Sequence, residues 1–212
     1  MICPACSLSF SDPTCVLLPP VRNSPPSSSI IDKVCIHLQT RYGAPARDVR
    51  PCIVTDSIRQ YGRVRRLDAG DDMRASSLVP TSEDRRDATW VKYDLLVDRN
   101  ARRRNAPPIF VPQSYFGQLE NILVVEVSPS PALNLRRPET LILAYIHACH
   151  PCYTNSLGMI LYDRMGVHEV VDITSVQCLV GRVPRRWPAP DLYAVVDRSS
   201  TVNRSIYVPD ED

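Results

Sequence analysis

Glycine and lysine are scarce in this chain of 212 residues, and long apolar runs are missing. Seven glycines stand against 20 prolines, a balance that disfavours long helices and favours short strands and turns. The longest apolar runs, Ile122–Val125 and Leu141–Ile146, are far shorter than the ~18 residues of a transmembrane helix. The N-terminus, MICPACSLSF, has neither a basic region nor a continuous apolar stretch. We therefore expect an intracellular protein with no signal peptide and no membrane partner.

The motifs of common catalysts are also missing. The sequence has no G-x-S-x-G elbow, P-loop, G-x-G-x-x-G or H-E-x-x-H pattern. Four histidines and many serines do not define a catalytic triad without such a motif. His168, beside an expected strand, is interpreted as a structural or surface residue. The sequence thus predicts a non-catalytic protein without a cofactor.

Positive charge is carried almost entirely by arginine, although the net charge is only +2. A whole-molecule field that attracts nucleic acid is therefore not expected. Arginine forks can instead bind phosphates locally, and Trp187 or Tyr61 could stack on a base. Solvated loops are the alternative interpretation, since Asp84, Asp87 and Asp98 are close in sequence. The candidate nucleic-acid-binding residues form three clusters: Arg63, Arg65 and Arg66; Arg102, Arg103 and Arg104; and Arg185, Arg186 and Trp187.

The eight cysteines include two pairs with the two-residue spacing of zinc ligands. These pairs are Cys3 with Cys6, and Cys149 with Cys152, the second flanked by His147 and His150. Cys-His-Pro-Cys also has the spacing of thioredoxin-like redox pairs, but a turn-like stretch follows it instead of a long helix. Unconnected reduced thiols, with the second pair in a loop, are the favoured interpretation. A cysteine-dependent zinc or redox protein is the alternative.

Composition divides the chain into a tail and one domain. Residues 1–29 contain six prolines and seven serines, and we expect a disordered tail there. Residues 30–43 carry apolar positions at helical spacing, but their β-branched run would equally suit a strand. Residues 44–208 are expected to form a single β-rich domain, and residues 209–212 an acidic tail.

The strand pattern predicts a mainly β fold. Trp90–Val97 alternates with a period of two, which is typical of a half-buried strand. A hairpin is expected to turn near Gly70, and Arg99–Pro108 is expected to be a loop. We predict a twisted antiparallel sheet or a partly closed barrel with few short helices. The further strands are expected at Tyr115–Val127, Thr140–Ala148, His168–Ile173, Val176–Val183, Leu192–Val196 and Ile206–Val208, while Leu157–Met165 suits a helical turn or a strand.

Residues 44–208 resemble a domain found in fungal open reading frames associated with DNA transposons, especially near CACTA-type transposase genes. The phrases that carry this resemblance are GRVRRLDAGDDMRASSLV (62–79), RRDATWVKYDLLVDRNAR (85–102), YFGQLENILVVEV (115–127), VVDITSVQCLVGRV (170–183) and YAVVDRS (193–199). The resemblance implies non-catalytic material rather than a transposase core.

A weaker resemblance is to the bromo-adjacent homology (BAH) domain, a chromatin-reading β-barrel. It is carried by Tyr115 and Gly117, and by a later segment like VVDITSVQCLVGRV, whereas Leu141–Cys149 lacks the Trp-x-x-Arg-Pro run of that domain. Trp90, Tyr93 and Tyr115 are aromatic-cage candidates by residue type. Together the observations predict a transposon-derived, nuclear binding or assembly module that contacts DNA or chromatin through arginine loops. A decayed transposon fragment without selected activity is a further alternative.

Overall fold

The computed structural model describes residues 14–67, 71–79, 87–103, 105–156, 158, 160–185 and 192–197. Ten strands and two α-helices lie in these ranges, with short 3₁₀ turns between them. The strands are β1 (Cys15–Arg22), β2 (Arg59–Arg66), β3 (Asp72–Arg74), β4 (Trp90–Asp98), β5 (Phe110–Val127), β6 (Glu139–Thr154), β7 (Ile160–Asp172), β8 (Val176–Leu179), β9 (Gly181–Arg185) and β10 (Leu192–Val196). The helices are α1 (Ser28–Tyr42) and α2 (Ala46–Val49), and the 3₁₀ turns are η1 (Arg50–Cys52), η2 (Thr55–Ser57), η3 (Pro131–Leu133) and η4 (Ile173–Ser175).

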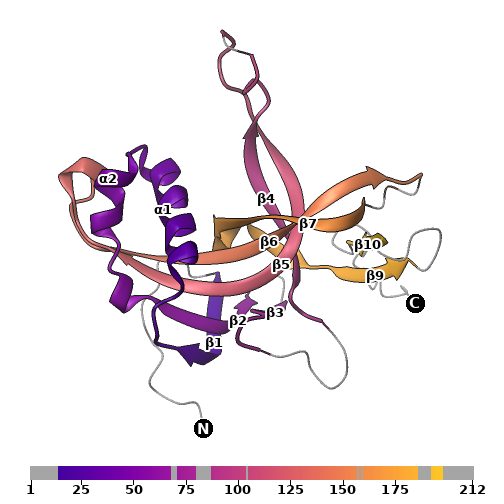
Figure 1. The fold of residues 1–212 in the computed structure, drawn as a ribbon, viewed down its shortest axis with the longest axis horizontal. Coiled ribbons are helices and arrows are strands. Elements are labelled where there is room, and N and C mark those ends of the chain that lie inside the picture. The colour runs from indigo at the N-terminus through magenta and orange to yellow at the C-terminus, as the bar shows by residue number, and fades with distance from the viewer. Residues whose placement is uncertain are drawn as a thin grey trace, which may run out of the picture.

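All the strands belong to one antiparallel sheet, which curls into an open half-barrel (Figure 1). The main path runs β1-β2-β5-β6-β7-β10-β9, with β3 paired to β2, and β4 paired to both β5 and β8. The predicted mainly β fold, a twisted antiparallel sheet with few helices, is confirmed.

Strand β5 is the centre of this sheet. One edge pairs with β4 over Phe110–Gln118 and then with β2 over Ile122–Val124, while the other edge pairs with β6. Its C-terminal half is rich in buried β-branched and leucine side chains, which suit a strand covered on both faces. The chain therefore changes partner along one strand, and the β4–β5 ribbon can leave the body of the sheet while β5 stays anchored in it.

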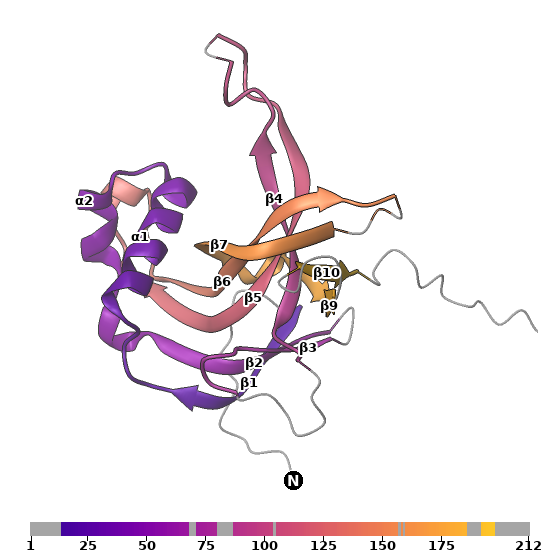
Figure 2. The same ribbon diagram turned by 45° about the vertical axis from the view of Figure 1, so that its right-hand side comes forward.

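Helix α1 covers one face of the sheet and, with α2, lies at one end of it (Figures 1 and 2). Val34, Cys35 and Leu38 follow one face of the helix and are buried against Leu123 and other apolar residues of β5 and β6. The helix ends at Gly43, whose φ of +62° is a left-handed conformation that glycine adopts without strain.

Polar contacts fix the C-terminal end of α1. Arg41 donates to Glu139 at 2.8 Å and to Asp172 at 3.2 Å, and the Tyr42 hydroxyl donates to Glu139 at 2.8 Å. The opposite face of the sheet, on the inside of the curl, buries a second cluster that includes Val64, Met73 and Tyr93. A third cluster, around Trp90, Phe116 and Tyr162, lies near β10.

The structure corrects the predicted boundaries. A disordered tail over residues 1–29 is wrong for Cys15–Arg22, which form β1 in register with β2, and for Ser28 and Ser29, which begin α1; residues 1–13 lie outside the described residues. The ambiguous segment 30–43 is helical. The strands expected at residues 115–127, 140–148 and 168–173 are longer than predicted, because their partly exposed extensions pair beyond the body of the sheet.

Of the other predicted segments, the single strand expected at residues 176–183 is divided into β8 and β9. The hairpin before and after Gly70 is confirmed by the pairing of β2 with β3, and Leu192–Val196 is a strand with the predicted bounds. The strand expected at residues 206–208 and the acidic tail at 209–212 lie outside the described residues. None of the helices in the described ranges is long and apolar enough to cross a membrane.

Candidate functional site

A two-stranded ribbon projects from the sheet, and we call residues 94–114 the arm (Figures 1 and 2). Its strands are the C-terminal part of β4 and the N-terminal part of β5, paired in register from Asp94 with Ser114 to Asp98 with Phe110. The predicted loop at residues 99–108 is the connection at its tip. The arm therefore holds that loop away from the body of the molecule.

Asp98 organises the tip of the arm. Its carboxylate accepts the backbone N–H groups of Asn100 and Ile109, both at 2.8 Å, and so ties the two ends of the connection together. The Asn100 side chain donates to the carbonyl of Pro107 at 2.7 Å, which braces the same turn. Among the described residues, the Asp98 carboxylate forms no ion pair with an arginine.

The arginines of the tip are exposed. Arg99, Arg102 and Arg103 are all exposed, and within the described part of the chain none of the three forms an ion pair. Asp94, the other acid of the arm, accepts the Ser114 hydroxyl at 2.6 Å. The arm thus presents guanidinium groups to solvent. Arg104 of the same predicted cluster lies outside the described residues.

One face of the arm carries two large apolar side chains that are open to solvent. Leu96 is 71% exposed and Phe110 is 62% exposed. Leu96 pairs with Pro112, and Phe110 pairs with Asp98 two residues further along β4, so both side chains lie on the same face of the ribbon. These two side chains were not predicted as site residues, because the exposure of an alternating strand depends on whether anything packs on it. Arg99 was placed in the predicted loop but lies outside its run of three arginines.

The first predicted cluster has a structural role instead. Arg63 and Arg65 both form ion pairs with Asp72, across the β2–β3 hairpin, and the hydrogen bond from Arg63 lowers the pKa of the Asp72 carboxyl. Arg66 reaches across the curl and donates to the carbonyl of Val176 at 3.0 Å. These guanidinium groups are therefore engaged within the fold, unlike those of the arm.

The third cluster is only partly described. Arg185 is the last residue of β9, while Arg186 and Trp187 lie outside the described residues, so a nucleic-acid contact there stays a prediction. The other proposed stacking residue, Tyr61, is buried in the cluster inside the curl.

The aromatic-cage candidates do not form one cage. Tyr93 is fully buried and stacks on Tyr115, with ring centroids 5.8 Å apart. Trp90 lies in a different cluster, where the Arg182 guanidinium is 4.3 Å from its ring centroid and 4.6 Å from that of Tyr193. The aromatic rings around Trp90 are thus already in contact with a cation of the chain itself.

The second cysteine pair lies in a strand, not in the predicted loop. Cys149 and Cys152 are both in β6, which continues to Thr154 because its pairing with β7 persists through several register shifts. Burial raises the pKa of the Cys149 thiol to about 12, the opposite of the lowered pKa that a redox pair requires. Cys3 and Cys6 lie outside the described residues, so a shared four-cysteine zinc site stays a prediction.

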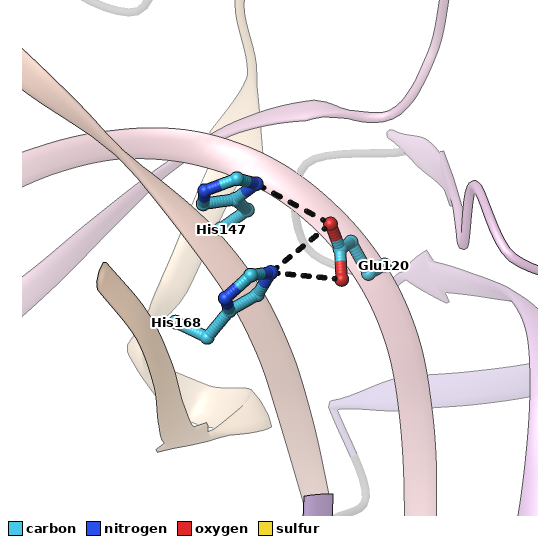
Figure 3. A group of neighbouring side chains, drawn as sticks. All are labelled: Glu120, His147 and His168. Carbon is cyan, nitrogen blue, oxygen red and sulfur yellow. Dashed lines mark hydrogen bonds and ion pairs between the residues drawn. The ribbon is translucent and has the colours of Figure 1, made fainter. Parts of the chain in front are cut away.

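Among the described residues, one group of side chains has the composition and spacing of metal ligands: Glu120, His147 and His168 (Figure 3). One potential ligand atom from each lies within 4.8 Å of the other two. His147 was considered in the sequence only as a flank of the cysteine pair, and Glu120 was missed. Nothing in the local sequence pattern sets these three residues apart from the other ionisable residues of β5, β6 and β7.

The chain was also compared with known proteins. No family model, curated protein or solved structure matches it. The resemblances to the transposon-associated domain and to the BAH domain therefore stay predictions, and function must be argued from the geometry.

Proposed function

We propose that this chain is a non-catalytic binding module that contacts duplex DNA through the β4–β5 arm. The observation that carries this proposal is the projecting arm, whose tip exposes Arg99, Arg102 and Arg103 without carboxylate partners among the described residues. Exposed guanidinium groups at the tip of a two-stranded ribbon are well placed to bind the phosphates on either side of a DNA groove.

The shape of the arm fits a groove of duplex DNA. A two-stranded β-ribbon is narrow enough to enter the major groove, and ribbon arms also serve minor-groove binders. The exposed pair Leu96 and Phe110 provides apolar side chains near the arginines, as in proteins that wedge such side chains between base steps. Phosphate contacts would position the arm, and the two apolar side chains would add affinity that salt does not screen.

The distribution of charge explains why the arm should dominate binding. With a net charge of +2, the protein exerts little long-range attraction on DNA. Arg41, Arg63 and Arg65 are compensated by carboxylates within the fold, which leaves the arm as a local source of uncompensated positive charge. We therefore expect weak binding at physiological salt that strengthens steeply as the salt concentration falls.

We also propose that the protein is derived from a transposon and is located in the nucleus, both of which agree with a DNA partner. They rest on the resemblance of residues 44–208 to domains of transposon-associated fungal open reading frames. A chromatin protein as the partner is the other outcome of the test below.

The proposal is tested by the salt dependence of binding. A labelled duplex is titrated with the full chain and with the triple variant Arg99→Ala/Arg102→Ala/Arg103→Ala at several salt concentrations, by fluorescence anisotropy. Each lost phosphate contact should reduce the slope of log K against log salt by about 0.9, so the triple variant should lose up to about 2.7. Thermal stability should change little, because the three side chains are exposed and unpaired with carboxylates among the described residues.

A matched control removes the same charge elsewhere. Arg47, Arg136 and Arg137 are exposed and lie near α2 and the β5–β6 connection, away from the arm. Their triple alanine variant should keep most of the slope. An unchanged slope in the arm variant, an equal loss in the control, or no binding even at low salt would refute the proposal, and the last result would point to a protein partner.

A further inference from the structure

Glu120, His147 and His168 are brought together by three adjacent strands, β5, β6 and β7 (Figure 3). His147 and His168 are directly opposite each other in the β6–β7 ladder, and their rings stack with centroids 3.9 Å apart. A β-bulge in β5 inserts Glu120 between Leu119 and Asn121, which pair with successive residues of β6. Bulges of this kind redirect a side chain, and here the carboxylate reaches both imidazoles.

The hydrogen bonding of His147 fixes which ring nitrogen faces Glu120. Its Nε2 lies 3.2 Å from the carbonyl oxygen of Gly166, and since a carbonyl can only accept, Nε2 carries the proton. Nδ1 is then directed at Oε1 of Glu120, 3.5 Å away. Nδ1 of His147 and the carboxylate of Glu120 thus face each other as two potential ligands of one cation.

The same carboxylate also lies beside His168, whose Nε2 is 3.3 Å from both oxygens of Glu120. One nitrogen of each histidine therefore faces the same carboxylate, from two stacked rings whose planes differ by 20°. Because an imidazole binds a metal in its own ring plane, one ring must turn about its Cβ–Cγ bond for both nitrogens to bind the same ion.

We infer that Glu120, His147 and His168 form a binding site for a zinc ion. Ligand atoms on a tetrahedral zinc, with bonds of about 2.0–2.1 Å, are about 3.3–3.4 Å from one another. The separations from Glu120 to the two histidines, 3.5 Å and 3.3 Å, are close to this spacing, and the two histidine nitrogens lie within 4.8 Å of each other. Two imidazoles and a carboxylate are also the ligand set that borderline-soft divalent ions prefer.

The surroundings support the rings and leave access to them. Tyr145 stacks on the outer face of His168, with centroids 5.1 Å apart and an interplanar angle of 11°, and Gly166 orients His147 from the other side. The three side chains are 25–34% exposed, so an ion can enter, and a water can complete the fourth position. This site is independent of the DNA proposal, because it shares no side chain with the tip of the arm.

The test uses Co²⁺ as a spectroscopic substitute for zinc. The full chain, metal-free and with its thiols reduced, is titrated with Co²⁺, and the visible d–d absorption is recorded. We expect one equivalent to give the intense bands of a tetrahedral ion without the near-ultraviolet thiolate-to-cobalt band, since the ligands are nitrogen and oxygen. One equivalent of Zn²⁺ should abolish the bands by displacement.

Variants assign the ligands. His147→Ala and His168→Ala should each weaken Co²⁺ binding by about 100-fold or more, because loss of a ligand costs more than the 10–100-fold typical of outer-shell changes. Glu120→Gln keeps the size of the side chain and tests the carboxylate even if a histidine variant fails to fold. His150→Ala is the matched control, since His150 is exposed on the same strand and is not part of the cluster.

Stability provides a second measurement. Saturating Zn²⁺ should raise Tm for the wild-type chain and for His150→Ala, but not for Glu120→Gln. The inference is overturned if the wild-type chain shows only the weak spectrum of a hydrated ion, if a thiolate band accompanies binding, or if Glu120→Gln and His150→Ala bind Co²⁺ equally well.

Discussion

Replacing Leu38 by alanine should weaken the packing of helix α1 on the sheet and lower the free energy of unfolding. Leu38 is 0% exposed and packs with Leu123, Val125 and Leu143 across the helix–sheet interface. The substitution deletes three carbon atoms, worth about 2.4 kcal/mol of transfer free energy at ~0.8 kcal/mol each. The cavity left behind adds to this, so we expect a loss of about 3–4 kcal/mol in the free energy of unfolding.

The matched control lies on the same helix. Ile36 is 56% exposed, and Ile36→Ala should change stability by less than about 0.5 kcal/mol, since alanine also has the higher helix propensity. Both variants are compared with the wild-type chain by urea unfolding, followed by far-ultraviolet circular dichroism and by tryptophan fluorescence.

Two results would refute the reasoning. If Leu38→Ala costs no more than Ile36→Ala, the helix does not contribute to the core as the structure indicates. If the two probes give different midpoints in the wild-type chain, α1 unfolds separately from the sheet and the two-state comparison does not apply.

Three further predictions concern other parts of the fold. Gly117→Ala should lower stability by about 2 kcal/mol, or roughly 4–8 °C in Tm by calorimetry, because a Cβ there would lie 2.6 Å from the backbone oxygen of His147; an unchanged Tm would contradict the β5–β6 register. Burial and the hydrogen bond to Glu139 raise the pKa of Tyr42 to about 12, so its contribution to stability is present below about pH 10 and is lost as the pH rises towards 12. Tyr42→Phe should therefore lose less stability than the wild-type chain over that range in urea unfolding at each pH, and parallel losses would show that Tyr42 does not titrate as expected. Because burial raises the pKa of Cys149 to about 12, its thiol should react slowly with iodoacetamide at pH 8 in the native protein and quickly in urea, by peptide mass spectrometry; equal rates would show that it is accessible as a thiolate.

Sequence periodicity predicted the strands whose pattern is local. Apolar and polar residues alternate over 91–97 because one face of this strand packs inside the curled sheet. Leu192–Val196 is a short apolar run that suits a strand. The mainly β fold could be predicted because the sequence contains many such runs. The lengths of β5 and β6 could not be predicted, because the ends of these strands are partly exposed and are held only by a neighbouring strand.

Local sequence patterns could not predict the long-range strand pairing at the N-terminus and at the cluster of Glu120, His147 and His168. The proline content of residues 1–29 argued against a strand, yet Cys15–Arg22 pairs with β2 on one side only, where few N–H donors are needed. Glu120, His147 and His168 meet through a bulge and through the register of three strands, and neither can be derived from spacing along the chain. The loop of the arm was predicted, but its projection depends on where β5 changes partner.

The openness of the half-barrel has a consequence for aggregation. An unclosed sheet exposes edge strands, among them β1 and β9 at the two ends of the main path, and such edges can recruit a strand from another molecule. Pro19 and Pro20 lie within β1, and Pro184 lies within β9. Because proline has no N–H group, these positions have no backbone donor to offer to an incoming strand. The prolines in these edge strands therefore disfavour aggregation, because they interrupt the hydrogen-bond ladder that a strand from another molecule would have to form.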